Sequence, residues 1–340
     1  MAQNLLPVPY FQGVFTIPKE LSSLTLGNRK AFFNLLFRSA AASLNERLAE
    51  ERGIRGGPQL ALHTWDQRLE AHVHVHVLHP AGGLSLDGSR WVVCPRIRSG
   101  KHRGKLCLVD NRMLSEVFRE KFLKGLDRLR RRGELKLEGS WSELREDGAW
   151  EQFMKPLREQ DWAVYLQPPP TEEASAEELV KYLARYVSGG PIGDSRMISD
   201  EEGTVTFWAR DKSKTGRRVP VRMSGVEFVR RWSLHILPKG FHRVRYYGGL
   251  HPSKRAAYLA RCRTLLAASS SCCEESGTSD SESADEWVSE EALARWQLQQ
   301  GICPSCRGPL RRMWSKPKPR SWRVVLASRL APAWYRPGGL

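Results

Sequence analysis

His72-Val73-His74-Val75-His76 is the stretch that decides the fold of this chain. Valine is β-branched and loses rotamer freedom in a helix, so the repeat predicts a β-strand. Successive side chains of a strand point to opposite faces, which places the three histidines on one face and the valines on the other. Neutral imidazole is a common metal ligand near neutral pH. The repeat therefore predicts a core strand that presents metal ligands, with a solvated row of histidines as the alternative.

The apolar pattern around this stretch predicts an α+β fold. Strands are expected at residues 10–17, 60–65, 204–208 and 219–223, and helices at 29–50, 113–132 and 225–236. The strand at 60–65 is joined to the histidine strand by a short polar turn, so the two form a hairpin, which Pro80, Gly82 and Gly83 end. The two strands of a hairpin run in opposite directions, so we expect an antiparallel sheet that contains the histidine strand.

A further helix is expected to begin near Ser175, after a proline-rich break. Ser175 and Glu178 have the spacing of a capping box. Tyr182 and Tyr186 follow on one apolar stripe, one helical turn apart, and the helix ends at Gly189. Taken alone, two tyrosines on such a stripe are more often core residues than nucleophiles.

The balance of charge points to a polyanionic partner. The chain of 340 residues carries 54 Lys and Arg against 37 Asp and Glu, a net charge of +17. An excess of this size is typical of proteins that bind nucleic acid, with general solubility as the alternative. Arginine forms the better fork for phosphate. We expect several arginines to face one groove with the histidine strand: Arg128, Arg130, Arg217, Arg230 and Arg245.

The sequence also limits the compartment. No run approaches the roughly 20 apolar residues that a membrane helix requires, so no membrane partner is expected. The start lacks the charged and apolar regions of a secretory signal. Seven cysteines, unevenly spaced, do not form a disulfide framework. These features predict a cytoplasmic, nucleoid-associated protein.

The composition changes in the last quarter of the chain. Residues 267–286 are dominated by Ser, Glu, Asp and Cys, which is typical of a disordered acidic linker. We expect one main domain over residues 1–265, the linker over 266–287 and a basic tail over 288–340. Cys303 and Cys306 form half of a zinc-ribbon motif, and zinc is not expected there because no second pair is suitably placed.

Several ordered blocks carry a family resemblance. His74-Val75-His76 is an HUH motif, in which a bulky apolar residue separates two histidines, and Tyr182-Leu183-Ala184-Arg185-Tyr186 resembles the two-tyrosine element of rolling-circle insertion-sequence transposases. Leu62-His63-Thr64-Trp65-Asp66-Gln67 is similar to the family's run before the histidine strand. The resemblance extends over about residues 6–265 and includes the blocks at 82–85, 118–123, 162–169 and 235–241.

The resemblance implies a fold and a set of site residues. It implies an HUH endonuclease domain: an antiparallel sheet with the histidine strand at its centre and the tyrosine-bearing helix packed across it. His74 and His76 would bind a divalent ion, Mg²⁺ or Mn²⁺, and Tyr182 and Tyr186 would attack single-stranded DNA at element ends and target. The family usually takes a third metal ligand from elsewhere in the domain. Gln67 is favoured, because an amide oxygen can coordinate a metal. His72 is the alternative, because it shares the face of His74 and His76.

The chain departs from the family pattern in several places. Asp66 and Arg68 flank Gln67 where the family commonly has Gly and Asn. The block beginning at Pro9 is expected to follow an N-terminal zinc module, which this chain is expected to lack. Alternative functions are a plasmid-type replication initiator or relaxase, a decayed non-catalytic DNA-binding remnant, and a hydrolytic metalloenzyme without a tyrosine intermediate. Ordinary structural or incidental roles are expected for the other candidates: His63, His79, His235, His242, Cys94 and Cys107.

Overall fold

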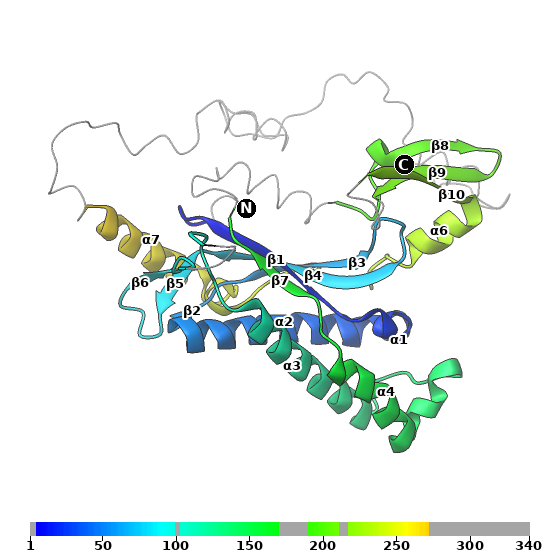
Figure 1. The fold of residues 1–340 in the computed structure, drawn as a ribbon, viewed down its shortest axis with the longest axis horizontal. Coiled ribbons are helices and arrows are strands. Elements are labelled where there is room, and N and C mark those ends of the chain that lie inside the picture. Colours follow the sequence, from blue (N-terminus) through cyan, green and yellow to red (C-terminus); the bar gives the residue numbers. More distant parts are fainter. Residues whose placement is uncertain (1–4, 99–102, 170–188, 211–216, 272–340) are drawn as a thin grey trace. The chain divides into compact units, whose positions relative to one another are not determined.

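The computed structural model describes residues 5–98, 103–169, 189–210 and 217–271 (Figure 1). They form two compact units, which are described separately. The first unit contains the described residues within 5–66, 70–189 and 234–271, and the second contains 67–69 together with those within 190–233. Helices and antiparallel strands occur in both units, which confirms the predicted α+β class.

A five-stranded antiparallel sheet organises the first unit. Its strand order is β11-β3-β4-β1-β7, so the histidine strand is central, as predicted. The strands are β1 (Tyr10–Thr16), β3 (Gln59–Trp65), β4 (Ala71–Pro80), β7 (Val164–Gln167) and β11 (Val244–Tyr246).

The valine face of the sheet carries the main core. Val73, Val75 and Val77 are at most 1% exposed, and each buried valine side chain stabilises the fold by about 1.5 kcal/mol or more. Two long helices, α2 (Arg29–Arg52) and α3 (Asn111–Arg131), lie along this face (Figure 1). The rings of Phe15 and Phe118 meet edge to face at 5.0 Å and join sheet to helix. The histidines therefore project from the face opposite these two helices.

A small second sheet and a C-terminal helix complete the first unit. The sheet contains β2 (Ile54–Arg55), β5 (Gly82–Ser85) and β6 (Trp91–Val93). Strand β4 ends at Pro80, as predicted for the hairpin, whereas Gly82 and Gly83 begin β5. Both are glycine because neighbouring atoms leave no space for a Cβ, which at Gly82 would lie 2.6 Å from the Val92 carbonyl. Helix α7 (Arg255–Ser271) packs over this sheet through Tyr258 and Leu259.

Shorter helices cover the remaining surface of the first unit. They are α1 (Ser22–Gly27), α4 (Asp147–Glu159) and the 3-10 turns at Lys19–Leu21, Gly139–Arg145 and Gly248–Leu250. Across the described part of the chain, no helix combines the length and apolar character needed to cross a membrane.

The second unit is a three-stranded antiparallel sheet with one helix. The strands β8 (Met197–Glu201), β9 (Thr204–Arg210) and β10 (Arg218–Ser224) pair in the order β10-β9-β8, which confirms the predicted hairpin. Helix α6 (Gly225–Ser233) ends three residues earlier than predicted. A 3-10 turn at Asp194–Arg196 precedes β8. Phe207 and Phe228, with ring centroids 5.9 Å apart, join the sheet to α6.

His79, at the end of β4, is a neutral imidazole inside the core. Its Nδ1–H donates to the Pro80 carbonyl at 2.7 Å, and its Nε2 accepts from the Gly57 N–H at 3.1 Å. Burial disfavours the charged ring and lowers the pKa of His79 from 6.5 to about 4. Protonation would also place a hydrogen on the nitrogen that accepts from Gly57.

Acid should therefore destabilise this protein through His79. Between pH 6.5 and about 4 the unfolded chain takes up a proton that the native ring refuses. The free energy of unfolding falls as the pH falls through this window, by about 3 kcal/mol from this residue, and His79 contributes no pH dependence above it. Urea unfolding at a series of pH values measures how steeply the free energy of unfolding depends on pH. We expect this dependence to be weaker in His79→Gln than in the wild type. The same change at the exposed His242 should leave the dependence unchanged. Equal slopes for wild type and His79→Gln would contradict this account.

Candidate metal centre

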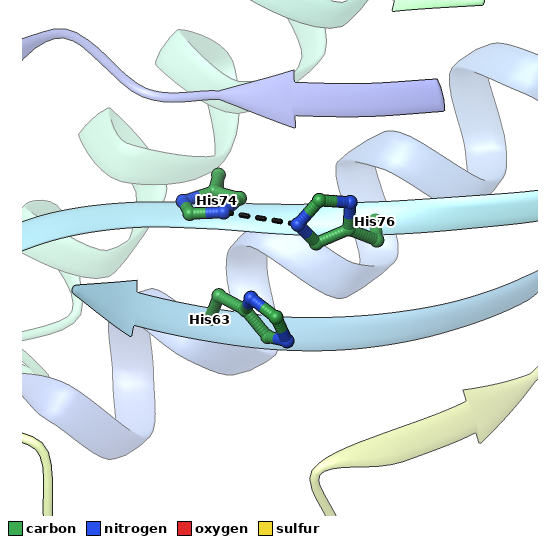
Figure 2. A group of neighbouring side chains, drawn as sticks. All are labelled: His63, His74 and His76. Carbon is green, nitrogen blue, oxygen red and sulfur yellow. Dashed lines mark hydrogen bonds between the residues drawn. The ribbon is translucent and has the colours of Figure 1, made fainter. Parts of the chain in front are cut away.

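Three histidine side chains meet on the face of the sheet opposite α2 and α3. His74 and His76 come from β4, and His63 comes from the neighbouring strand β3 (Figure 2). His63 lies directly opposite His74 in the strand register, so the two side chains share a face. One ring nitrogen from each of the three lies within 4.8 Å of the others. His63 and His74 are buried and His76 is partly buried.

Hydrogen bonding orients the His74 ring. Its Nδ1 lies 2.9 Å from the carbonyl oxygen of His72, and since a carbonyl only accepts, Nδ1 carries the hydrogen. The Nε2 lone pair of neutral His74 then points at Nε2 of His76, 3.2 Å away. Two imidazole nitrogens bound to one ion at about 2.1 Å lie roughly 3.0 to 3.4 Å apart. A backbone carbonyl that holds the second ring nitrogen is also the usual support of a metal-binding histidine. The pair therefore fits a shared metal ion.

Burial and repulsion from neighbouring cationic groups keep the rings of His74 and His76 neutral. Burial, followed by the neighbouring histidines, lowers the pKa of His74 well below its usual value. Burial, His63 and the guanidinium of Arg243 lower the pKa of His76 to about 3. A metal ion needs the neutral form of each ligand, so protons compete little with an ion at neutral pH.

His63 joins this cluster, although an ordinary structural role is expected for it from the sequence alone. The strand register brings it to His74 and His76. The ladder between β3 and β4 is unbroken from Gln59 to His63 and shifts only beyond it, before Trp65. The available signal was the alternation of β3: Leu60 and Leu62 are core residues, so His63 lies on the other face, opposite His74.

The other predicted site residues lie elsewhere or outside the described residues. His72 shares the face of His74, with ring centroids 4.9 Å apart, but it is not part of the mutually close group. Gln67 lies in the turn between β3 and β4 and belongs to the second unit; its side chain is exposed, and its carbonyl accepts a hydrogen bond from Arg196. Tyr182 and Tyr186 lie outside the described residues, as do Cys303 and Cys306.

Arg243 brings a cation close to the histidine cluster. This residue immediately precedes β11 in the chain. Its guanidinium lies 4.8 Å from the ring centroid of Trp65, and the Trp65 ring stacks on His63. Nε donates to the Leu62 carbonyl at 3.0 Å and Nη1 to the Gly189 carbonyl at 2.6 Å. Nη2 is buried and has no hydrogen-bond partner among the residues that the structure describes. Burying such a donor without an acceptor is costly, so Nη2 is a candidate donor to a bound anion.

Two of the five candidate arginines, Arg130 and Arg245, make contacts within the fold instead. Arg130 donates to the Leu144 carbonyl and lies 5.3 Å from the Trp150 ring, which ties α3 to α4. Arg245 lies opposite Leu60 and packs 4.5 Å from the ring of Phe37 on the apolar side of the sheet. Both guanidinium groups stabilise the fold, and Arg245 lies on the face away from the histidines.

Comparison with known proteins gives the class of this chain. Residues 57–257 match the family described as "Putative transposase", which is more than half of the chain, so the protein belongs to this family. It is similar to the "Putative transposase y4qJ" of Sinorhizobium fredii (strain NBRC 101917 / NGR234), with 36% identity over 77% of this chain and 64% of the relative.

A second relative agrees with this assignment. The transposase for insertion sequence element IS801 of Pseudomonas savastanoi pv. phaseolicola is 27% identical over 77% of this chain and 60% of its own length. The chain thus spans less than two thirds of the length of both relatives. No solved structure gives a significant match.

Proposed function

We propose that this protein is a metal-dependent transposase that cleaves and rejoins single-stranded DNA at the ends of an insertion sequence. The observation that carries the proposal is the group of three ring nitrogens from His63, His74 and His76 in a chain of this family. The names of both relatives favour transposition over the replication-initiator and relaxase alternative. The substrate strand and the covalent mechanism come from the sequence motifs.

The histidine cluster supplies the ligands in this proposal. His74 and His76 bind the ion, and His63 is the third ligand that the strand register favours; Gln67 and His72 stay as the sequence-based alternatives. A bound Mg²⁺ or Mn²⁺ polarises a phosphate oxygen and offsets negative charge during displacement at phosphorus. The carbonyl of His72 fixes the ring of His74, which holds its Nε2 in place for the ion.

Tyr182 and Tyr186 are the proposed nucleophiles. The tyrosine oxygen bonds to phosphorus, the bond from phosphorus to the departing 3′-oxygen breaks, and that oxygen takes a proton to become a 3′-hydroxyl. In the reverse step a 3′-hydroxyl attacks the phosphotyrosine and the tyrosine leaves. The energy of the ester is retained, so rejoining needs no nucleotide triphosphate. Two tyrosines permit two attachments in sequence.

Arg243 is the proposed phosphate-binding residue. Its Nη2 is the buried donor without a partner, and its positive charge is close enough to lower the pKa of His76. Nη1 holds the carbonyl of Gly189, which follows Tyr186 by three residues in the sequence. Arg243 would thus donate to an oxygen of the scissile phosphate beside the ligands. Hydrogen bonds to charge that develops in a partly buried site are strong contributors to catalysis.

Replacing Arg243 by lysine should slow cleavage while preserving the charge. Lysine cannot contact Leu62, Gly189 and a phosphate from one planar group. We expect the rate of adduct formation at saturating metal and DNA to fall about 100-fold. Arg245→Lys is the matched control, because Arg245 lies on the opposite face, and its rate should match wild type once equal folding has been verified by circular dichroism. A wild-type rate for Arg243→Lys would remove Arg243 from the reaction.

Formation of a covalent adduct tests the proposal as a whole. The protein is incubated with end-labelled single-stranded DNA of element ends and with Mg²⁺ or Mn²⁺, then separated on a denaturing gel. We expect a labelled band at the size of the protein that chelation by EDTA prevents. Cleavage without any adduct would favour the hydrolytic metalloenzyme, and DNA binding without cleavage would favour the decayed remnant; either outcome contradicts the proposal.

A further inference from the structure

The small sheet of the second unit has one buried face and one open face. Val205, Phe207 and Ala209 of β9 are at most 1% exposed, and Val205 and Phe207 pack in one cluster with Phe228 of α6. The alternate residues of β9 therefore lie on the other face. They include Trp208, whose side chain is 37% exposed, and Arg210, which is exposed.

Strand β10 adds two more arginines to the open face. Arg218 is paired with Arg210, and Arg222 is paired with Thr206, so each shares the face of its partner. Pro220, directly opposite Trp208, lies between them. We call Trp208, Arg210, Arg218 and Arg222 the open-face residues. Arg218 and Arg222 are four residues apart along the strand, about 13 Å, which matches about four stacked nucleotides of a DNA strand.

The open-face arginines differ from the other arginines of this unit. Among the described residues, Arg210, Arg218 and Arg222 form no ion pair and no side-chain hydrogen bond. Arg230 and Arg231 on α6, in contrast, both pair with Glu227 at 2.6 Å. A carboxylate, Glu201, lies opposite Thr204, at the end of the sheet away from Arg210 and Arg218. Three arginines without an ion pair among the described residues thus share one face of the sheet with a partly exposed indole.

We infer that this open face is a binding site for single-stranded DNA. An exposed aromatic ring stacks on an unpaired base, and arginines along the same surface contact the phosphates on either side; this is how sequence-tolerant single-strand sites are built. A paired base cannot offer its face to Trp208, which favours a single strand over a duplex. The inference is independent of the proposed chemistry, because it involves neither the histidines nor the tyrosines.

Fluorescence anisotropy with a labelled thymidine 20-mer tests this site in the full chain. The assay contains EDTA, so that the result does not depend on metal or cleavage. We expect Trp208→Ala to weaken binding about 5- to 100-fold, as for one lost stacking contact, and Trp208→Phe to retain most of the affinity. Arg210→Gln combined with Arg218→Gln should reduce the slope of log K against log salt by about 1.4, the loss of two phosphate contacts.

The matched control is Arg112→Gln combined with Arg158→Gln, which removes the same charge from two exposed arginines that pair with Glu116 and Glu151. It should leave affinity and slope nearly unchanged. Wild-type affinity for Trp208→Ala, or equal losses for the two double variants, would overturn the site. Equal binding of a duplex of the same length, with the same dependence on Trp208, would overturn its selectivity for single strands. Circular dichroism is used to check that each variant is folded. We expect folding to be retained, because the changed residues are exposed.

Discussion

Changing Tyr182 and Tyr186 together to phenylalanine should abolish the covalent protein–DNA adduct and leave the affinity for single-stranded DNA unchanged. The change removes only the hydroxyl group, so it separates chemistry from packing: a core tyrosine tolerates it and a nucleophile does not. Each single change should still allow one attachment and impair complete strand transfer. The adduct gel measures the first effect, and joining of two labelled strands measures the second.

Tyr165 provides the matching control for this prediction. Tyr165 lies on β7 and is paired with Val14 of β1, and Val14 is paired with His76 of β4. Paired residues share a face, so Tyr165 lies on the histidine face, where it is 52% exposed. Tyr165→Phe should form the adduct at the wild-type rate. An adduct that survives in the Tyr182→Phe plus Tyr186→Phe variant and disappears when Tyr165 is also changed would assign the nucleophile to Tyr165 and contradict our proposal.

Loss of the histidine ligands should have an equally large effect. We expect His74→Ala combined with His76→Ala to eliminate cleavage and metal binding while the fold is retained, because the opposite face of β4 carries the core. His63→Ala should reduce the rate at limiting metal at least 100-fold and be partly rescued by excess Mn²⁺, since two ligands persist. Manganese binding, followed by electron paramagnetic resonance, reports on the ion without relying on activity.

The same measurements distinguish the candidates for the third ligand. If His63 is that ligand, Gln67→Ala and His72→Ala should each bind Mn²⁺ more tightly than His63→Ala does. The exposed His242, changed to alanine, should behave as wild type. A larger loss of Mn²⁺ affinity in Gln67→Ala or His72→Ala than in His63→Ala would assign the third ligand to that residue. Metal-dependent cleavage by the His74→Ala plus His76→Ala variant would contradict the metal centre itself.

Strong local patterns allowed much of the fold to be predicted from the sequence. The valine and histidine alternation of β4 and the apolar stripe of α2 each extend over several residues, and both predictions are confirmed. The outer strands of the same sheet were not predicted. Strand β7 has four residues and β11 has three, too few for alternation to be distinguished from chance. Their positions depend on pairing with strands distant in the sequence.

His63 shows why the site was only partly predictable. Alternation with the core residues Leu60 and Leu62 predicts the face on which His63 lies. The residue that His63 meets across the hairpin depends on the register, and the shift between His63 and Trp65 makes that register differ from the one counted from the turn. The pair of His74 and His76 lies on one strand and could be predicted from spacing, whereas the pairing that brings His63 to them could not.

The central position of β4 has a consequence for exchange with solvent. The strand is bonded to β1 on one side and to β3 on the other, so its amide hydrogens should exchange with deuterium only when the whole first unit opens. The backbone that carries His74 and His76 then stays hydrogen-bonded for as long as the first unit stays folded. Ions should enter and leave this centre without any refolding of the strand, and bound metal should slow deuterium uptake by β4, because an ion that binds only the folded unit makes opening of that unit rarer.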